Sequence, residues 1–173
     1  MSLFLRIEDQ KRELLEELGG WKPERLRFQP GANEWSALQM VDHIMRTERE
    51  ILLVVYSNEG SNHSVGIVDR LRTRFVHSVF RSKRRVKVPS SARIVLPGSV
   101  TDLDVLAKQW NEVRATLAQN IERLVAQPPG RGIFRHPVAG WMDMQAVLEF
   151  FSVHMLHHGF QLERLHAASD RLK

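Results

Sequence analysis

Apolar residues recur every three or four positions between residues 103 and 124, and this spacing constrains the fold more than any other feature of the chain. The series is Leu103, Leu106, Trp110, Val113, Leu117, Ile121 and Leu124. At 3.6 residues per turn these side chains share one face of an α-helix, and that face must be buried against other elements. The segment therefore predicts an amphipathic helix that contributes to a helical core.

Three further segments combine a helical apolar stripe with boundary signals, and they are residues 3–19, 36–56 and 143–168. Ser36 and Gln39 have the spacing of a capping box, and Trp35 is placed to pack against the first turn. Asp143 is the predicted N-cap of the last helix, and Thr101 is the predicted N-cap of the helix at 103–124.

The sequence shows no extended alternation of the kind that marks strands, and no internal repeat. Four long helices with one long connection between the second and third predict an all-α four-helix bundle, in a single domain over residues 1–173. The connection of roughly 40 residues allows the second and third helices to run in the same direction. Residues 65–80 within it are expected to form an extra basic helix that packs outside the bundle or covers one end of it, whereas 88–99 and 127–140 are expected to be loops.

Several classes of protein are excluded by what the chain lacks. It has no cysteine, so disulfides, thiolate zinc sites and cysteine nucleophiles are ruled out. The longest apolar run, Ile51 to Tyr56, is far shorter than the roughly 20 residues that cross a bilayer. The first residues carry charges too early for a secretory signal. We therefore expect a cytoplasmic protein without a membrane partner.

Positive charge is concentrated in residues 70–87. This segment holds eight basic residues and no acidic one, and the net charge of +5 becomes −3 when those eight are left out. Phe75 and Phe80 alternate with the arginines, a composition suited to phosphate contact and base stacking in nucleic-acid binding. Two other interpretations remain: a solvated basic helix that packs its apolar residues on the bundle, or a positive surface that attracts an anionic substrate.

Three of the eight histidines fall in HMLHHGFQ, residues 154–161. His154 and His158 are four residues apart, so they lie on one helical face and can reach one ion, whereas His157 points about 100° away. His43, at the edge of the apolar face of helix 36–56, can supply a third imidazole. Three histidines with an open coordination position suit zinc, nickel or ferrous iron. The alternative is that each is a core histidine hydrogen-bonded to a neighbour.

Two stretches, WSALQMVDHI at 35–44 and HPVAGWMDMQAVLEFFSVHMLHHGFQ at 136–161, resemble the DinB/YfiT-like superfamily of metalloenzymes. The family pattern places one histidine on the second helix and an H-x-x-x-H on the fourth, followed by a glycine and a glutamine. The matching positions are His43, His154, His158, Gly159 and Gln161. The resemblance implies a four-helix bundle with a nickel or zinc triad at one end of a cleft, and reactions that include thiol transfer from low-molecular-weight thiols.

The leading hypothesis is an enzyme in which a divalent metal on His43, His154 and His158 activates water or a small thiol. Gln161, Glu50 and His157 are its further catalytic candidates, as orienting group, general base and proton donor. Two alternatives stand beside it. One is a nucleic-acid-binding stress protein that uses residues 70–87 and a structural metal, and the other is a non-catalytic metal-binding protein that acts through protein contacts, including those of a homodimer.

Overall fold

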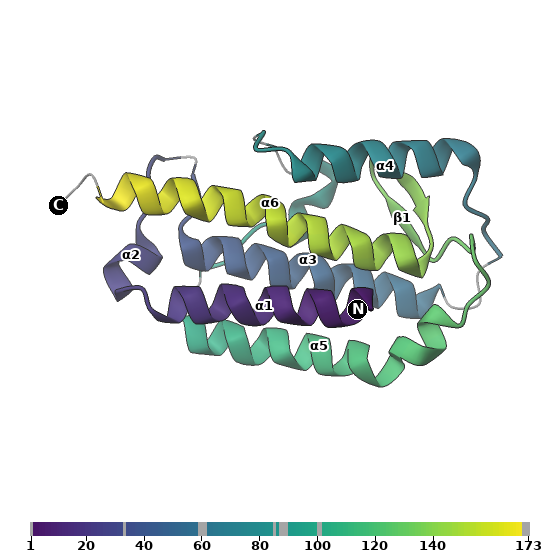
Figure 1. The fold of residues 1–173 in the computed structure, drawn as a ribbon, viewed down its shortest axis with the longest axis horizontal. Coiled ribbons are helices and arrows are strands. Elements are labelled where there is room, and N and C mark those ends of the chain that lie inside the picture. The colour runs from purple at the N-terminus through teal and green to yellow at the C-terminus, as the bar shows by residue number, and fades with distance from the viewer. Residues whose placement is uncertain are drawn as a thin grey trace.

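Four long helices lie side by side and make up most of the structure (Figure 1). They are α1 (Leu3–Gly19), α3 (Ala37–Ser57), α5 (Leu103–Val125) and α6 (Met144–Asp170). The computed structural model describes residues 2–32, 34–58, 62–84, 86, 90–99 and 102–170. The helical fold class that the sequence predicts is confirmed.

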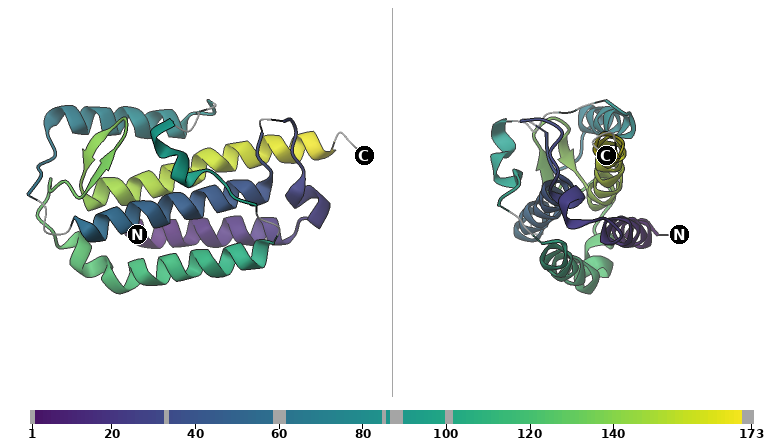
Figure 2. Two further views of the ribbon diagram at one scale, coloured as in Figure 1. Left: turned by 180° about the vertical axis from the view of Figure 1, so that it is seen from behind. Right: turned by 90° about the vertical axis from the view of Figure 1, so that its left-hand side faces the viewer.

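Each long helix buries its apolar face between its neighbours. Helix α1 packs against α5 and α6, and α3 packs against the same two helices. The chain runs through α3 and α5 in one direction and through α1 and α6 in the opposite direction (Figure 1). The end-on view in Figure 2 shows the helices around a shared interior. The most buried side chains there include Trp110, Phe151 and Leu117, so the apolar stripe at 103–124 faces the core as predicted.

The predicted helix starts are formed by side-chain caps. The Ser36 hydroxyl accepts from the Gln39 N–H at 3.3 Å, and the Gln39 side-chain oxygen accepts from the Ser36 N–H at 3.0 Å. Asp143 accepts from an N–H in the first turn of α6 at 2.9 Å. Thr101 lies outside the described residues, and Asp102 caps α5 by accepting two N–H bonds from its first turn.

The basic helix of the connection is α4 (Ile67–Arg81), which packs along α6 and against the strand β2. It lies at the outer edge of the molecule, on the far side of α6 from α5 (Figures 1 and 2). Its buried residues are Thr73, Val76 and His77. Only a narrow strip of α4 therefore faces the protein, and most of its surface faces solvent.

Short elements lie in the connections between the long helices. They are α2 (Pro23–Arg27), the 3₁₀ helix η1 (Ser90–Val95), and the antiparallel strands β1 (Phe134–His136) and β2 (Gly140–Met142). Of these, η1 and β1 fall within the segments 88–99 and 127–140, which were expected to be loops. Gly140 adopts φ +80° at the end of the hairpin turn, a conformation that glycine adopts without strain. The expectation of a loop at 127–140 was wrong for β1, because three-residue strands are too short to show alternation. Among the described residues, no helix is long and apolar enough to cross a membrane.

Candidate metal centre

Three imidazoles from two helices converge in the helical core. His43 comes from α3, His154 and His158 come from α6, and all three are buried. Each offers a ring nitrogen that lies within 4.8 Å of those of the other two. His154 Nε2 and His158 Nε2 are 3.1 Å apart. The structure thus brings together the three histidines that the sequence analysis assigned to a metal.

Two of the three rings are held from outside by oxygen acceptors. His43 Nδ1 donates to the carbonyl of Val95 at 2.7 Å, and His158 Nδ1 donates to Gln161 Oε1 at 2.9 Å. A neutral imidazole carries one N–H, so Nε2 of each ring keeps a lone pair. Metal-ligating histidines characteristically have such an outer contact, which fixes both the tautomer and the ring orientation.

His154, the third ring, has one buried nitrogen without a hydrogen-bond partner among the described residues. Its Nδ1 makes no hydrogen bond with the described residues, while its Nε2 donates to the lone pair on His158 Nε2. Two nitrogens bound to one ion at about 2.0–2.1 Å lie roughly 3–3.5 Å apart, so the observed 3.1 Å fits an ion. His154 must then move its proton to Nδ1. Burying that unpaired N–H costs about 1–3 kcal/mol, which is small beside the roughly 10–16 kcal/mol of structural zinc binding.

Burial keeps the three imidazoles in the form that binds a metal. Desolvation lowers the pKa of His43, and the Val95 carbonyl and the Asp42 charge only partly oppose this. Burial, followed by the neighbouring histidines, lowers the pKa of His154 and His158 well below the ordinary value. Because only a neutral imidazole offers a lone pair, no proton has to be displaced from these side chains near neutral pH.

Aromatic rings enclose the triad. The Trp35 ring lies 4.7 Å from the His43 ring and is nearly parallel to the His158 ring at 6.2 Å. Phe150 stacks on His154 at 5.3 Å, and Phe80 meets the same ring edge-on at 5.5 Å. These apolar walls lower the local dielectric constant, and charge interactions at the triad are correspondingly stronger than in water.

Gln161 links the triad to His157. Its Oε1 accepts from His158, and its Nε2 donates to His157 Nε2 at 3.0 Å. His157 is buried, and desolvation followed by the charge of Arg164 lowers its pKa to about 4. Gln161 therefore acts on the triad through His158, and His157 is linked to the triad through its hydrogen bond with Gln161.

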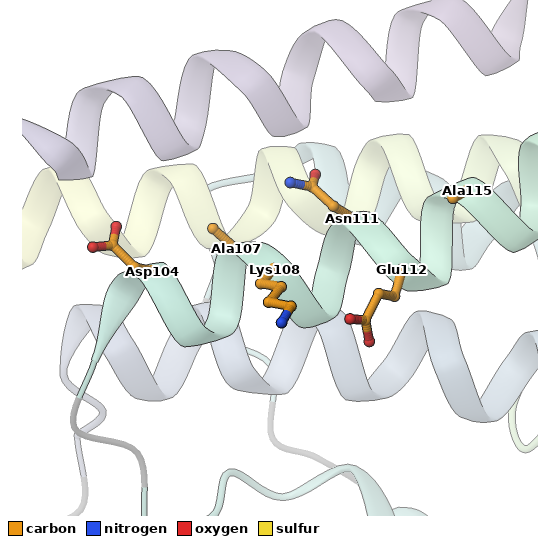
Figure 3. Close-up of a pocket in the computed structure, with 6 residues that line it drawn as sticks. All are labelled: Asp104, Ala107, Lys108, Asn111, Glu112 and Ala115. Carbon is orange, nitrogen blue, oxygen red and sulfur yellow. The ribbon is translucent and has the colours of Figure 1, made fainter.

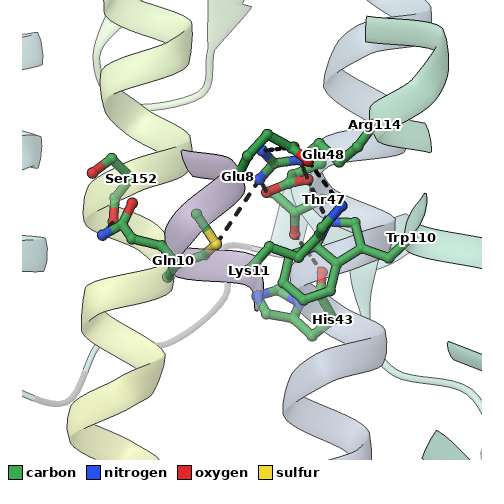
Figure 4. A network of polar contacts seen from close by, with 10 residues as sticks. Glu8, Gln10, Lys11, His43, Thr47, Glu48, Trp110, Arg114 and Ser152 are labelled. Atoms are coloured by element: carbon green, nitrogen blue, oxygen red, sulfur yellow. Dashed lines mark hydrogen bonds and ion pairs between the residues drawn. The ribbon is translucent and has the colours of Figure 1, made fainter. Parts of the chain in front are cut away.

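Glu50 lies two turns beyond His43 on α3, where it forms an ion pair with Arg49 at 3.2 Å. A different glutamate of α3, Glu48, is fully buried and accepts from Arg114 and from Trp110 (Figure 4). Sequence reasoning missed this network. The signal available was a charged residue on the apolar face of each of two long helices.

The basic segment divides into a paired and an unpaired part. Arg81 pairs with Glu149, and Lys83 pairs with Glu163 at 3.5 Å. Arg70, Arg72 and Arg74 are exposed, while Arg85 and Lys87 lie outside the described residues. The two phenylalanines of this segment have different environments, since Phe75 is exposed whereas Phe80 packs beside His154.

Two grooves lie away from the triad. One is a shallow groove of about 550 Å³ along α5, lined by Asp104, Ala107, Lys108, Asn111, Glu112 and Ala115 (Figure 3). The other, of about 340 Å³, lies where α1 meets α2 beside Trp21 and Arg25. No histidine of the triad lines either of them. The cleft implied by the family resemblance is therefore not one of these two grooves.

Comparison with known proteins identifies a matching family. The sequence model of the DinB superfamily matches residues 6–162. No curated protein and no solved structure matches the chain.

Proposed function

The chain belongs to the DinB superfamily, and from this premise we propose that it is an enzyme whose divalent transition metal is held by His43, His154 and His158. The observation that carries the proposal is the convergence of these three buried imidazoles, with ligand atoms within 4.8 Å of one another. We take residues 1–173 as one four-helix-bundle domain, in which the segment between α3 and α5 is the long crossover connection.

The chemistry proposed is activation of water or of a small thiol, which makes the protein a hydrolase or a thiol transferase. Such an ion, when bound, lowers the pKa of its water or thiol ligand and so supplies a nucleophile near neutral pH. An all-nitrogen ligand set is compatible with nickel, zinc and ferrous iron alike. Within the chain, Val95 and Gln161 hold two of the rings in place, and the rings of Trp35 and Phe80 exclude bulk water.

The three further residues have different proposed roles. Gln161 is a positioning residue, because it holds the His158 ring by its Nδ1. His157 and Glu50 stay candidates for proton transfer, His157 through its contact with Gln161 and Glu50 through its place beyond His43 on α3.

Metal content tests the first step. Protein purified without chelator is analysed by inductively coupled plasma mass spectrometry, beside His158→Ala and the control His166→Ala. His166 also lies on α6 but at a distant, half-exposed position, where it pairs with Asp170. We expect about one transition metal per chain in wild type and His166→Ala, and a loss of at least about tenfold in His158→Ala. Metal-free wild type, or equal metal in both variants, refutes the site.

A second assay separates an enzyme from a metal-binding protein that has no activity. Metal-loaded wild type is given an electrophilic aryl chloride with a panel of small thiols, and separately an activated ester with water alone. Transfer or hydrolysis that disappears in His158→Ala supports the enzyme. Gln161→Ala is expected to keep its metal within about tenfold of wild type but to lose turnover. Full metal occupancy with no reaction in either assay supports a non-catalytic role instead.

A further inference from the structure

The solvent-facing side of α4 carries an apolar ridge. Ile67, Leu71 and Phe75 follow one another at intervals of four residues, with exposed fractions of 80%, 61% and 66%, and Val68 lies beside them at 58%. The other exposed apolar residues form no such series: Leu5 on α1 is a single position, and Leu53 and Val54 on α3 are only a pair of neighbours, which is ordinary for a protein surface. Four large apolar side chains on one exposed helix face are a contiguous patch, and patches of this kind mark interaction surfaces.

Arginines flank this ridge on both sides. At about 100° per residue, Arg72 lies on one side of the ridge, and Arg70 and Arg74 lie on the other. None of the three guanidinium groups forms an ion pair or hydrogen bond with the described residues. The single acidic residue of α4, Asp69, accepts from the N–H of Gly66 at the start of the helix. The ridge and its flanks therefore present apolar and positive groups and no negative one.

We propose that this face of α4, the residues Ile67, Val68, Leu71 and Phe75 with Arg70, Arg72 and Arg74, binds the surface of an anionic lipid bilayer. A helix lying in the membrane interface places its apolar residues below the headgroups and its arginines at the level of the lipid phosphates. Helix α4 lies along the outer edge of the molecule (Figure 1), so a flat surface can reach the whole ridge.

The same observations argue against three other occupants. Two copies joined through α4 would bring arginines against arginines with no acidic partner, and like charges across an interface are unfavourable. A duplex nucleic acid offers phosphates but no apolar environment for the four ridge residues. An acidic peptide helix is normally bound in a groove, and neither groove described above is lined by α4.

Co-sedimentation with vesicles tests the proposal on the full chain. Vesicles of phosphatidylcholine alone are compared with vesicles containing about 30% phosphatidylglycerol, at about 0.1 M and about 0.5 M salt. We expect wild type to sediment with the anionic vesicles, less so at high salt, and not with phosphatidylcholine. Each arginine near such a surface contributes about 1 kcal/mol, so Arg72→Gln with Arg74→Gln should weaken partitioning roughly 30-fold. Leu71→Ser with Phe75→Ser should weaken it by at least about tenfold.

Matched controls remove equivalent exposed groups elsewhere. Leu5→Ser with Val125→Ser removes two apolar side chains, each 54% exposed, on α1 and α5. Arg12→Gln with Lys108→Gln removes two exposed charges from the same two helices. Both controls should bind as wild type does. The proposal is overturned if anionic vesicles leave wild type in the supernatant at low salt, or if the Leu71/Phe75 variant binds as wild type does. Two further results would overturn it. One is that the Leu71/Phe75 variant abolishes a dimer that analytical ultracentrifugation detects in wild type, and the other is that this variant abolishes binding of wild type to random-sequence DNA.

Discussion

Replacement of Arg114 by methionine should destabilise the protein more than any surface substitution. Arg114 and Glu48 are 1% and 0% exposed, and the guanidinium donates to both Glu48 oxygens at 2.7 and 2.6 Å. A third bond, of 2.9 Å, runs to Glu8 on α1 (Figure 4). Burial alone would lower the pKa of Arg114, but the carboxylates of Glu48 and Glu8 raise it. The charged arginine therefore holds α1, α3 and α5 together.

The magnitude follows from what the substitution leaves behind. Without Arg114, the Glu48 carboxylate stays fully buried with the Trp110 N–H as its one remaining partner in the network. Removal of one partner of a buried ion pair costs about 3–5 kcal/mol, a large share of the roughly 5–15 kcal/mol that stabilises a domain. Neutralising the stranded carboxylate should reverse much of this loss. Adding Glu48→Gln to Arg114→Met is therefore expected to restore about 1–3 kcal/mol.

Urea unfolding followed by circular dichroism at neutral pH measures these differences. The control is Arg12→Met, which removes an exposed ion pair with Asp9 on α1 and should change the unfolding free energy by at most about 0.5 kcal/mol.

Two results would refute this reasoning. One is a loss below about 1 kcal/mol for Arg114→Met, which would mean that water or a rearranged side chain satisfies Glu48 at little cost. The other is a double variant that is no more stable than Arg114→Met, because the stranded charge would then not be the source of the loss.

Three smaller predictions concern acid, helix propensity and the metal. Burial, and then the charge of His77, lowers the pKa of His136 from 6.5 to about 4, so the unfolded chain binds more protons below pH 6.5. This contribution to stability, at most about 3 kcal/mol, is complete above pH 6.5 and lost as the pH falls to 4. The urea midpoint of His136→Asn should therefore depend less on pH than the midpoint of wild type. Gly159→Ala should raise the unfolding free energy by about 0.5–1 kcal/mol, measured by urea unfolding, since an added Cβ meets nothing within 4 Å; a loss of stability would contradict this. The Trp35 ring lies beside His43, so nickel should quench tryptophan fluorescence in wild type and much less in Trp35→Phe. Equal quenching in the two proteins would place the ion elsewhere.

The main helices could be predicted because their signals are local. The capping box at Ser36 and Gln39 and the cap at Asp143 depend on residues three positions apart or less, and the structure forms both. The hairpin at 134–142 depends on pairing across a turn and on the contact of Gly140 with Asp69 of α4, where a Cβ would lie 2.1 Å from the Asp69 carboxylate. Strands of three residues are too short to show an alternation of apolar and polar residues, so the sequence does not indicate these contacts.

The candidate site divides in the same way. The pair His154 and His158 follows from helical geometry, because residues four apart share a face. His43 follows only if α3 lies against α6, which the family resemblance supplied and residue spacing alone did not. The buried pair of Glu48 and Arg114 was missed because the apolar stripe of 103–124 was counted through its apolar members, although Arg114 falls four residues after Trp110 on the same face.

The outer contact of His43 shows where sequence reasoning necessarily stops. Its acceptor is the backbone carbonyl of Val95, 52 residues away, and every residue has a carbonyl, so no residue type could have marked this position. The same connection is anchored to α3 by a second backbone group, because the N–H of Gly98 donates to Asp42 at 2.7 Å and Arg46 pairs with that carboxylate at 2.9 Å. A Cβ at position 98 would lie 2.8 Å from a terminal nitrogen of the Arg46 side chain, so a larger residue there would require that side chain to shift. The connection therefore supplies part of the site through its path over α3, and that path is set by tertiary packing.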